Sequence, residues 1–502
     1  MINLQYFCKT TLKIIRFQYK KGFFMLKNVF FTYILFFVFS NIFAQNLTNK
    51  KYKIQELQED FEMMVSALQE AHPALYEYIS QEDWNENVEE TKNLLDKTMT
   101  EIEFYNTIKP LIFKIKDGHT ALLLSEESDE LLKTSIRLFP LDLEFLDKKA
   151  LVTKNYSENP IPIGAEILEI QQQKINEILP KMVQREAVDG NIRTATYWRL
   201  SQGLFGFEWF YLFGETREFE VKYLPKGENN PQRTVLKAVS FRKKTELQTD
   251  SLTRRLENPF HLKFLENQTA ILTLDIISDL PDEKTPFVHF IKESFEKIKI
   301  NKTKNLILDL RNNGIGDDVY GAFLYSFLTD SAFKYYDKQA IKQRKYSFIK
   351  DTDDQSINRL VSNHHKKELD DGSFEISLDG LEKTQKPSKN AFLGNLYVLI
   401  NGGTFGTASE VASLIQFHKK GKIVGEESGS TFHATSSGFI PYLKLRHSKL
   451  QLTIPLVRYH LAVSQENLEG KGVLPDWEIS KKIEDILQNK DSVLEYILEK
   501  IK

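Results

Sequence analysis

The most constraining feature of this 502-residue chain is a set of continuous apolar runs that alternate with amphipathic segments in its second half. A strand that is apolar on both sides must be covered on both faces, which is typical of a mostly parallel sheet flanked by helices. The pattern therefore predicts an α/β core. The runs and the amphipathic segments between them are 270–274, 284–298, 305–310, 318–328, 396–400, 408–417 and 422–425.

The composition is that of an ordinary folded protein. Hydrophobic residues make up 41% and charged residues 27%, and the formal net charge is −2. High apolar content with little net charge excludes a mainly disordered chain. The near cancellation of charge gives no reason to expect a nucleic-acid partner. The length allows about two to four domains, so the sequence favours a multidomain enzyme or binding protein.

The chain divides into three regions after its N-terminal segment. Residues 45–135 carry apolar side chains at helical spacing and end with a glycine turn and a short apolar strand at 117–124. Residues 136–240 show short alternating strands separated by turns, which predicts a small β-rich module. Residues 241–502 hold the α/β pattern, and we expect one helix over 483–501 to close the chain.

Residues 1–44 are predicted to be a secretory signal peptide. They contain six Lys or Arg and no acidic residue, followed by the apolar run Val29–Phe39. This run is shorter than the ~20 residues that span a bilayer, so we expect an exported protein, periplasmic or extracellular, without a stable membrane span after cleavage. The alternative is an uncleaved anchor at 25–44. Translation from Met25 would make 1–24 a mis-assigned extension.

The sequence predicts neither a cofactor nor a metal. The only cysteine, Cys8, lies in the signal segment, so the mature chain has no thiol nucleophile, thiolate zinc ligand or disulfide. His364 and His365 lie in a lysine-rich polar stretch and are expected to be solvated. The metalloprotease pattern H-E-x-x-H does not occur in the sequence.

Four loop segments place glycine or polar residues at the ends of predicted strands, where ligands gather in α/β proteins. Gly314 and Gly316 follow a buried strand and offer backbone N–H groups to an anion or oxyanion, although no Walker lysine follows to make a phosphate cradle. A strand-to-helix junction at 401–410 suits a nucleophile. Taken singly, each segment also fits an ordinary turn or helix cap. The segments are 117–120, 309–318, 401–410 and 469–476.

In combination these segments resemble the tail-specific, C-terminal-processing serine peptidases, in particular their tricorn-like branch with an Asp-Gly-His-Thr turn. The string 305–314 is similar to that family's most specific motif, and 401–410, 423–426 and 472–476 follow in the right order. The resemblance extends over nearly all of the mature chain. It implies a ClpP/crotonase-like core, a PDZ-like module at 136–240, and a polypeptide as substrate or ligand.

The resemblance also implies site residues. His119 corresponds to the catalytic base and Glu469 to the acid that orients it. Gly314 or Gly316, with the N–H of Thr407, corresponds to the oxyanion hole. The alternative Ser-Lys arrangement of the family is absent, because Thr431 stands where its lysine would be.

The expected nucleophile position is Gly406, which offers no hydroxyl. Thr407 or Ser409 could replace the missing serine, or His119 could activate water directly. The sequence therefore leaves two main functions: an exported serine endopeptidase with reduced or altered chemistry, and a catalytically inactive pseudopeptidase that binds peptides or protein C-termini. A sugar- or nucleotide-processing α/β enzyme is the third alternative.

Overall fold

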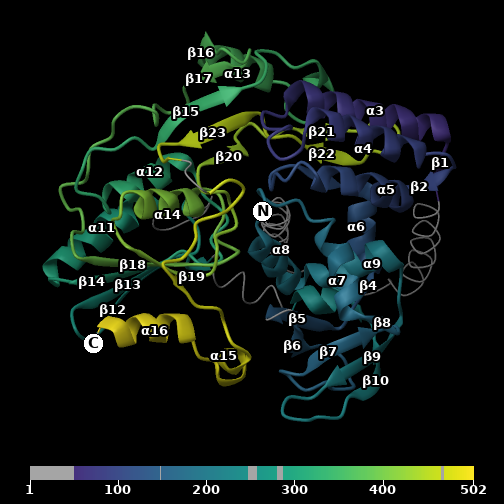
Figure 1. Cartoon of the computed structure of the whole chain (residues 1–502), viewed down its shortest axis with the longest axis horizontal. Helices are drawn as coiled ribbons and strands as arrows, with labels where there is room; N and C mark the ends of the chain where they lie inside the picture. The colour runs from purple at the N-terminus through teal and green to yellow at the C-terminus, as the bar shows by residue number, and fades with distance from the viewer. Residues whose placement is uncertain (1–49, 147–148, 247–256, 280–285, 465–467, 502) are drawn as a thin grey trace, which may run out of the picture.

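A computed structural model describes residues 50–146, 149–246, 257–279, 286–464 and 468–501. The predicted signal peptide lies outside the described residues. Among the described helices, none combines the length and the apolar character needed to cross a bilayer. The predicted mixed α/β, multidomain fold is confirmed (Figure 1).

The core is a six-stranded sheet covered on both faces, as the apolar runs predict. Its first two strands pair antiparallel and all later neighbours pair parallel. Because side chains alternate along a strand, Leu306 and Leu308 face the main hydrophobic core, whereas Ile307 packs with Val493 and Ile497 on the other face. The strands, in spatial order, are β12 (Phe260–Phe264), β13 (Thr269–Leu274), β14 (Asn305–Asp309), β18 (Asn395–Ile400), β19 (Lys422–Gly425) and β24 (Trp477–Glu478).

Helices on one face of this sheet join the main core, and a C-terminal helix covers the other face (Figure 1). One helix was predicted over 483–501, but the structure has two, so this prediction is wrong. Asn489 adopts a left-handed conformation (φ 52°) that ends the first of them. The helices are α11 (Phe287–Ile300), α12 (Asp318–Ser326), α14 (Thr407–Phe417), α15 (Ile483–Gln488) and α16 (Ser492–Ile501).

Two smaller sheets lie beside the core. The first contains five strands, with α13 (Ile357–His364) near one edge. The second has three strands and joins the N-terminal region to the rest, because β3 (Ala121–Leu123) pairs with β22. The other strands are β15 (Tyr336–Ile341), β16 (His365–Glu368), β17 (Phe374–Ile376), β20 (Ala434–Ser437), β21 (Tyr442–Lys444), β22 (Gln451–Thr453) and β23 (Val457–Leu461).

The N-terminal region is helical, as its periodicity predicts. Three helices supply the apolar side chains that enter the main core, and a fourth follows β3. Thr100 caps the third helix and Glu103 completes a capping box. The helices are α3 (Ile54–Ala71), α4 (Gln81–Asn93), α5 (Glu101–Phe113) and α6 (Glu126–Ser135).

Residues 141–237 form a separate antiparallel sheet with its own hydrophobic core. Helices accompany the predicted strands here, and the aromatic run 205–213 forms one whose Trp209 and Phe205 fill this core. The elements are β5 (Leu141–Leu146), β6 (Lys149–Asn155), β7 (Glu166–Ile170), β8 (Gln173–Lys174), β9 (Glu218–Leu224), β10 (Gln232–Lys237), α7 (Ile175–Val183), α8 (Arg193–Arg199) and α9 (Phe205–Phe213).

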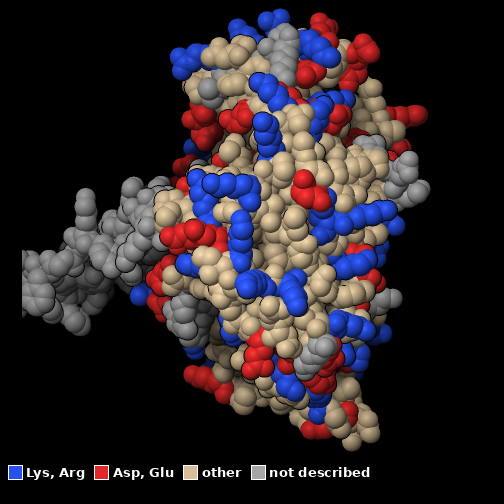
Figure 2. Space-filling model, turned by 90° about the vertical axis from the view of Figure 1, so that its left-hand side faces the viewer, with Lys and Arg blue, Asp and Glu red and all other residues tan. Residues whose placement is uncertain are grey.

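Charged side chains of both signs are distributed over the surface. On the face of the molecule that carries α11 and α12, Lys and Arg side chains are interspersed with Asp and Glu around uncharged surface (Figure 2). This face therefore has no extended region of a single sign, in keeping with the net charge of −2.

Candidate functional site

A sharp turn links β18 to α14 and presents Gly406 at the start of the helix. Gly406 is the N-cap residue, with φ 57° and ψ −132°. This conformation is that of the first central residue of a type II′ turn, which glycine adopts at little cost. A strand, a strained turn and a helix are the elements of a nucleophile elbow, and the helix N-terminus beyond the turn stabilises negative charge.

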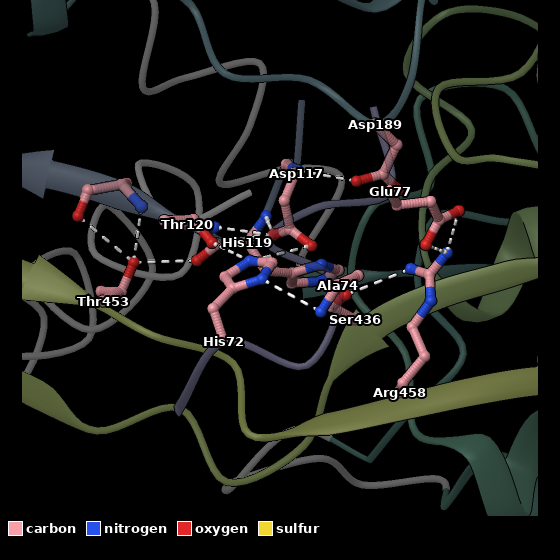
Figure 3. Close-up of polar contacts among 12 residues, drawn as sticks. His72, Ala74, Glu77, Asp117, His119, Thr120, Asp189, Ser436, Thr453 and Arg458 are labelled. Atoms are coloured by element: carbon pink, nitrogen blue, oxygen red, sulfur yellow. Dashed lines mark hydrogen bonds and ion pairs between the residues drawn. The ribbon is translucent and has the colours of Figure 1, made fainter. Parts of the chain in front are cut away.

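His119 lies in a turn that Asp117 and Thr453 hold in place. Asp117 Oδ1 accepts hydrogen bonds from the N–H groups of His119 and Thr120, both at 2.9 Å. Thr453 Oγ1 accepts from the N–H of Ala121 at 2.8 Å and donates to the carbonyl of His119 at 2.8 Å. Thr453 belongs to β22, which pairs with β3, so the three-stranded sheet fixes the turn that carries His119 (Figure 3).

The His119 turn and the Gly406 elbow meet in space. The ring centroids of His119 and Phe405 are 5.0 Å apart, and a Cβ built on Gly118 would lie 2.8 Å from the Phe405 ring. On its other side, Gly406 donates its N–H to Ser430 Oγ at 2.9 Å. Two stretches separated by almost 290 positions therefore lie in contact, while a shared catalytic role of His119 and residue 406 stays a prediction.

A buried histidine, His72, supports the turn from behind. The N–H of Ala74 donates to its Nδ1 at 3.2 Å, so its Nε2 carries the proton and donates to Thr120 Oγ1 at 2.9 Å. The Thr120 hydroxyl in turn donates to Asp117 Oδ1 at 3.1 Å (Figure 3). Burial lowers the pKa of His72 to about 4. His72 is therefore neutral at pH 7 and acts as a fixed hydrogen-bond donor.

Asp189 completes the group around His119. Its Oδ1 accepts the N–H of Gly118 at 2.7 Å. Burial, followed by the negative charge of Asp117, raises the pKa of Asp189 to about 7. Burial also lowers the pKa of His119 to about 4, so the imidazole is neutral and able to accept a proton only from a strongly activated donor.

Two residues around His119, Asp189 and His72, carry no functional signal in the sequence. Asp189 precedes Gly190 in a D-G turn that has no sequence signature other than that of a turn. His72 precedes Pro73, which by itself indicates only the end of a helix. No local pattern distinguishes either residue, because their roles arise from contacts with residues about 45 to 70 positions away.

The two substitute hydroxyls point away from His119. Thr407 Oγ1 lies 3.4 Å from Asp318 Oδ1. Ser409 Oγ lies 2.8 Å from Ser428 Oγ and 3.3 Å from the carbonyl of Ser430. Both residues are buried. Thr407 and Ser409 are therefore each engaged by groups other than the imidazole.

The residues assigned to the oxyanion hole lie beside the elbow. A Cβ on Gly316 would come within 2.4 Å of Thr407 Cβ, so the backbone of the 309–318 loop packs directly against the first residue of α14. Gly314 is buried next to Asn313, whose carbonyl accepts the N–H of Phe405 at 2.9 Å. The N–H of Thr407 is in the first turn of the helix, where such groups have no acceptor within the helix.

Glu469 is exposed and does not contact His119 in the described part of the chain. Its negative charge acts instead on His433, whose pKa burial lowers. The neighbouring Gly470 accepts the N–H of Asn191 at 2.8 Å, which places the Glu469 loop against the turn that carries Asp189. The orienting role of Glu469 stays a prediction, and the carboxylates that surround His119 are Asp117 and Asp189.

The strand, turn and helix around Gly406 have the arrangement of a nucleophile elbow, and the buried imidazole of His119 packs against the neighbouring Phe405. The model of peptidase family S41 matches residues 282–479. The matched residues, fewer than half of the chain, are similar to this family. The match includes the elbow and the 309–318 loop, whereas His119 and Asp189 lie before it.

The two solved structures of CPAF described first have a fold similar to that of this chain. Mature CPAF has 14% sequence identity and a TM-score of 0.59, and the match covers 89% of this chain and 97% of CPAF. Its complex with lactacystin also has 14% identity, with a TM-score of 0.62 over 89% and 98% of the two chains. The photosystem II D1 C-terminal processing protease has 14% identity and a TM-score of 0.40 over 84% and 93%. No curated protein matches the sequence.

Proposed function

We propose that this protein is a polypeptide-binding member of the S41 family that has lost the acyl-enzyme chemistry of a serine peptidase. One observation carries the proposal: the residue in the elbow conformation is Gly406, while the imidazole of His119 packs against its neighbour Phe405. Loss of a triad nucleophile reduces turnover by about 10⁶-fold elsewhere. The site therefore retains its base and helix terminus but has no hydroxyl between them.

Three features support a polypeptide ligand in an exported setting. Family S41 consists of peptidases, so its sites accept peptide chains. The separate sheet of residues 141–237 lies in the proposed PDZ-like module, which would take an extended peptide as an added strand. The basic and apolar pattern of residues 1–44 supports export to the periplasm or the medium.

The substitution Gly406→Ser tests the proposal. The parent protein should not react with a fluorophosphonate probe and should not cleave casein. Gly406→Ser should acquire probe labelling at residue 406, found by mass spectrometry, and casein cleavage that the further substitution His119→Ala abolishes. A side chain at this φ costs about 1–3 kcal/mol of strain, so the folding of the variant is checked by thermal unfolding.

A matched control is Gly227→Ser. Gly227 also has a positive φ (+80°), and a Cβ there meets nothing within 4 Å. This variant introduces a serine at an unrelated left-handed turn and should remain unlabelled. Peptide binding is measured on the parent by fluorescence anisotropy with labelled extended peptides. A folded Gly406→Ser protein that is neither labelled nor active, together with a parent that binds no peptide, would refute the proposal.

Residual peptidase activity through Thr407 is the second candidate. Its hydroxyl lies beside Asp318, whose pKa burial raises to about 6, and beside the Gly316 backbone. A carboxyl with such a pKa is suited to accept a hydroxyl proton near neutral pH. Stoichiometric probe labelling of the parent at Thr407, lost in Thr407→Val, would establish this activity in place of the inactive site.

A further inference from the structure

Three ligand-type side chains converge around the His119 turn. Asp117, His119 and Asp189 are each buried to 3–4% exposure, and each offers a ligand atom within 4.8 Å of the others. Two of their polar atoms, His119 Nδ1 and Asp189 Oδ2, are buried without a hydrogen-bond partner. A side-chain hydrogen bond from Ser430 acts to lower the pKa of Asp189, but its geometry leaves Oδ2 without a partner at normal hydrogen-bond distance and angle. Buried polar atoms without partners are rare and indicate a missing partner.

The cluster also has unbalanced charge. Arg458 lines the adjoining space, and its guanidinium is already paired with Glu77, with Nη2 to Oε1 at 2.6 Å (Figure 3). Lys116 borders the same space, but its Nζ donates to Asn191 Oδ1 at the surface at 2.7 Å. The positive charge of Arg199 also acts on Asp189, but its Nη1 donates to the carbonyl of Ala187 at 2.6 Å. Among the described residues, neither Asp117 nor Asp189 therefore forms an ion pair with a Lys or Arg. Buried charges in proteins are paired or coordinate metals.

A small cavity adjoins the cluster. It has a volume of about 10 Å³ and is lined by Asp117, Asp189, Tyr78 and Arg458, among others. The hydroxyl of Tyr78 is buried without a partner. A cavity of this size holds about one water molecule. A water placed there would reach the carboxylates and the Tyr78 hydroxyl.

We propose that Asp117, His119 and Asp189 form a binding site for one divalent transition-metal ion of the Zn²⁺ type, with a water in the adjoining cavity as the fourth ligand. Zn²⁺ binds His nitrogen and Asp or Glu oxygen, and open zinc sites combine three protein ligands with a water. Ca²⁺ and Mg²⁺ need about six oxygen ligands, more than the cluster offers. Zinc ligands lie roughly 3.5 Å apart, so binding draws the three groups together by about 1 Å.

The site is assembled from two parts of the fold. Asp117 and His119 come from the turn before β3, and Asp189 follows α7. The hydrogen bond from Gly118 N–H to Asp189 Oδ1 already joins these parts without an ion. The donor atoms are therefore held near one another before binding, which reduces the cost of ordering them.

Titration of the metal-free protein with ZnCl₂ tests the proposal. The purified chain, stripped by a chelator, should bind one Zn²⁺ with a Kd of about 1 μM or tighter. Co²⁺ in its place should give the intense visible bands of a four-coordinate site. Asp189→Asn and His119→Gln should each weaken Zn²⁺ binding by more than the roughly 10–100-fold that loss of a metal's outer-shell partner causes.

His447→Gln is the matched control, because His447 also pairs with a carboxylate, Glu59, at 2.8 Å but on α3. It should bind Zn²⁺ as the parent does. No Zn²⁺ binding by the parent would overturn the proposal, as would equal binding by the parent and both ligand variants. Unfolding curves of the metal-free variants separate lost ligands from lost structure. The test uses no peptide and no probe, so its failure leaves the proposed peptide binding untouched.

Discussion

Two groups of carboxylates flank the Gly406 elbow: Glu410 with Asp318 on one side, and Asp117 with Asp189 on the other. The two groups differ in how many of their oxygens accept hydrogen bonds. On the α12 side, the hydroxyls of Tyr335 and Tyr336 donate to Glu410 at 3.0 and 3.1 Å, and Thr407 lies beside Asp318. On the His119 side, Asp117 accepts several hydrogen bonds, but Asp189 keeps an oxygen without a partner. One pair is enclosed by donors, and the other is left incomplete.

This difference separates structural from functional polar groups. A fully satisfied buried network rigidifies the fold, and the Glu410 group fixes the first turn of α14, on which the elbow rests. A buried network with unsatisfied hydrogen-bonding atoms lowers stability, and it persists where a binding or catalytic site requires those atoms. We therefore expect the Glu410 group to carry stability and the Asp189 group to carry binding. Substitutions in the two groups should then have effects of different size and sign.

The largest effect is expected for Glu410→Ala. Glu410 is 3% exposed, and its removal leaves a cavity and two tyrosine hydroxyls without their acceptor. The free energy of unfolding should fall by about 3–5 kcal/mol. Urea unfolding of the parent and the variant measures this change. Glu410→Gln keeps the volume and one acceptor and should lose less. A loss below that of an ordinary surface substitution would contradict the structural role.

The carboxyl of Asp318, beside Glu410, should make the free energy of unfolding depend on pH. Burial raises its pKa from 3.8 to about 6, so the folded state holds this proton more tightly than the unfolded state does. Its contribution to stability is therefore complete below pH 3.8 and is lost as the pH rises through about 6. The difference between the parent and Asp318→Asn should change by about 2 kcal/mol between pH 4 and pH 7, below the full value because solvent reaches part of Asp318.

The control for this measurement is Asp330→Asn, since Asp330 is an exposed carboxylate paired with Lys420. This variant should keep the pH dependence of the parent between pH 4 and 7. If Asp318→Asn also keeps it, the carboxyl of Asp318 titrates normally, and Thr407 has no base beside it. The second candidate function would then lose its support.

The fold was predictable because its signals are local. Continuous apolar runs of about 4–8 residues, such as 305–310 and 396–400, are typical of buried strands, and both lie side by side in the sheet. The break between α15 and α16 was missed, because the apolar spacing continues across Asn489. What ends the helix is the left-handed conformation of Asn489, followed by Asp491, which pairs with the distant Arg311 at 2.7 Å.

Residues of the candidate site could be predicted only where they lie in a sequence motif. Gly406 and His119 lie in segments with recognisable turn residues, and the structure brings them together. The place of Asp189 in the site could not be predicted from the sequence, because it depends on the hydrogen bond from Gly118, 71 positions away. The expectation of no metal rested on sequence spacing alone. The proposed ligand set is assembled in three dimensions and has no sequence spacing that identifies it.

Gly118→Ala should break the contact between the two halves of the site at moderate cost. A Cβ there would lie 2.8–2.9 Å from the Phe405 ring and 3.1 Å from Asp189 Oδ1. Overpacking of this kind should lower the free energy of unfolding by about 1–2 kcal/mol. Gly206→Ala is the control, since its Cβ meets nothing closer than 3.5 Å inside α9 and should stabilise. Equal stability of Gly118→Ala and the parent would show that the turn and Phe405 do not pack together.

The smallest change in the free energy of unfolding is expected for Asp189→Asn in the metal-free protein. This change should be stabilising or close to zero, whereas Glu410→Ala and Gly118→Ala destabilise. The amide oxygen still accepts the N–H of Gly118, while the substitution removes a negative charge buried beside Asp117. At pH 8, where the parent carboxyl is ionised, the free energy of unfolding should stay constant or rise by up to about 1 kcal/mol. Glu410→Gln, the equivalent change on the other side of the elbow, should lower it. A loss of about 2 kcal/mol or more in Asp189→Asn would make Asp189 a structural group like Glu410, and the contrast between the two sides of the elbow would disappear.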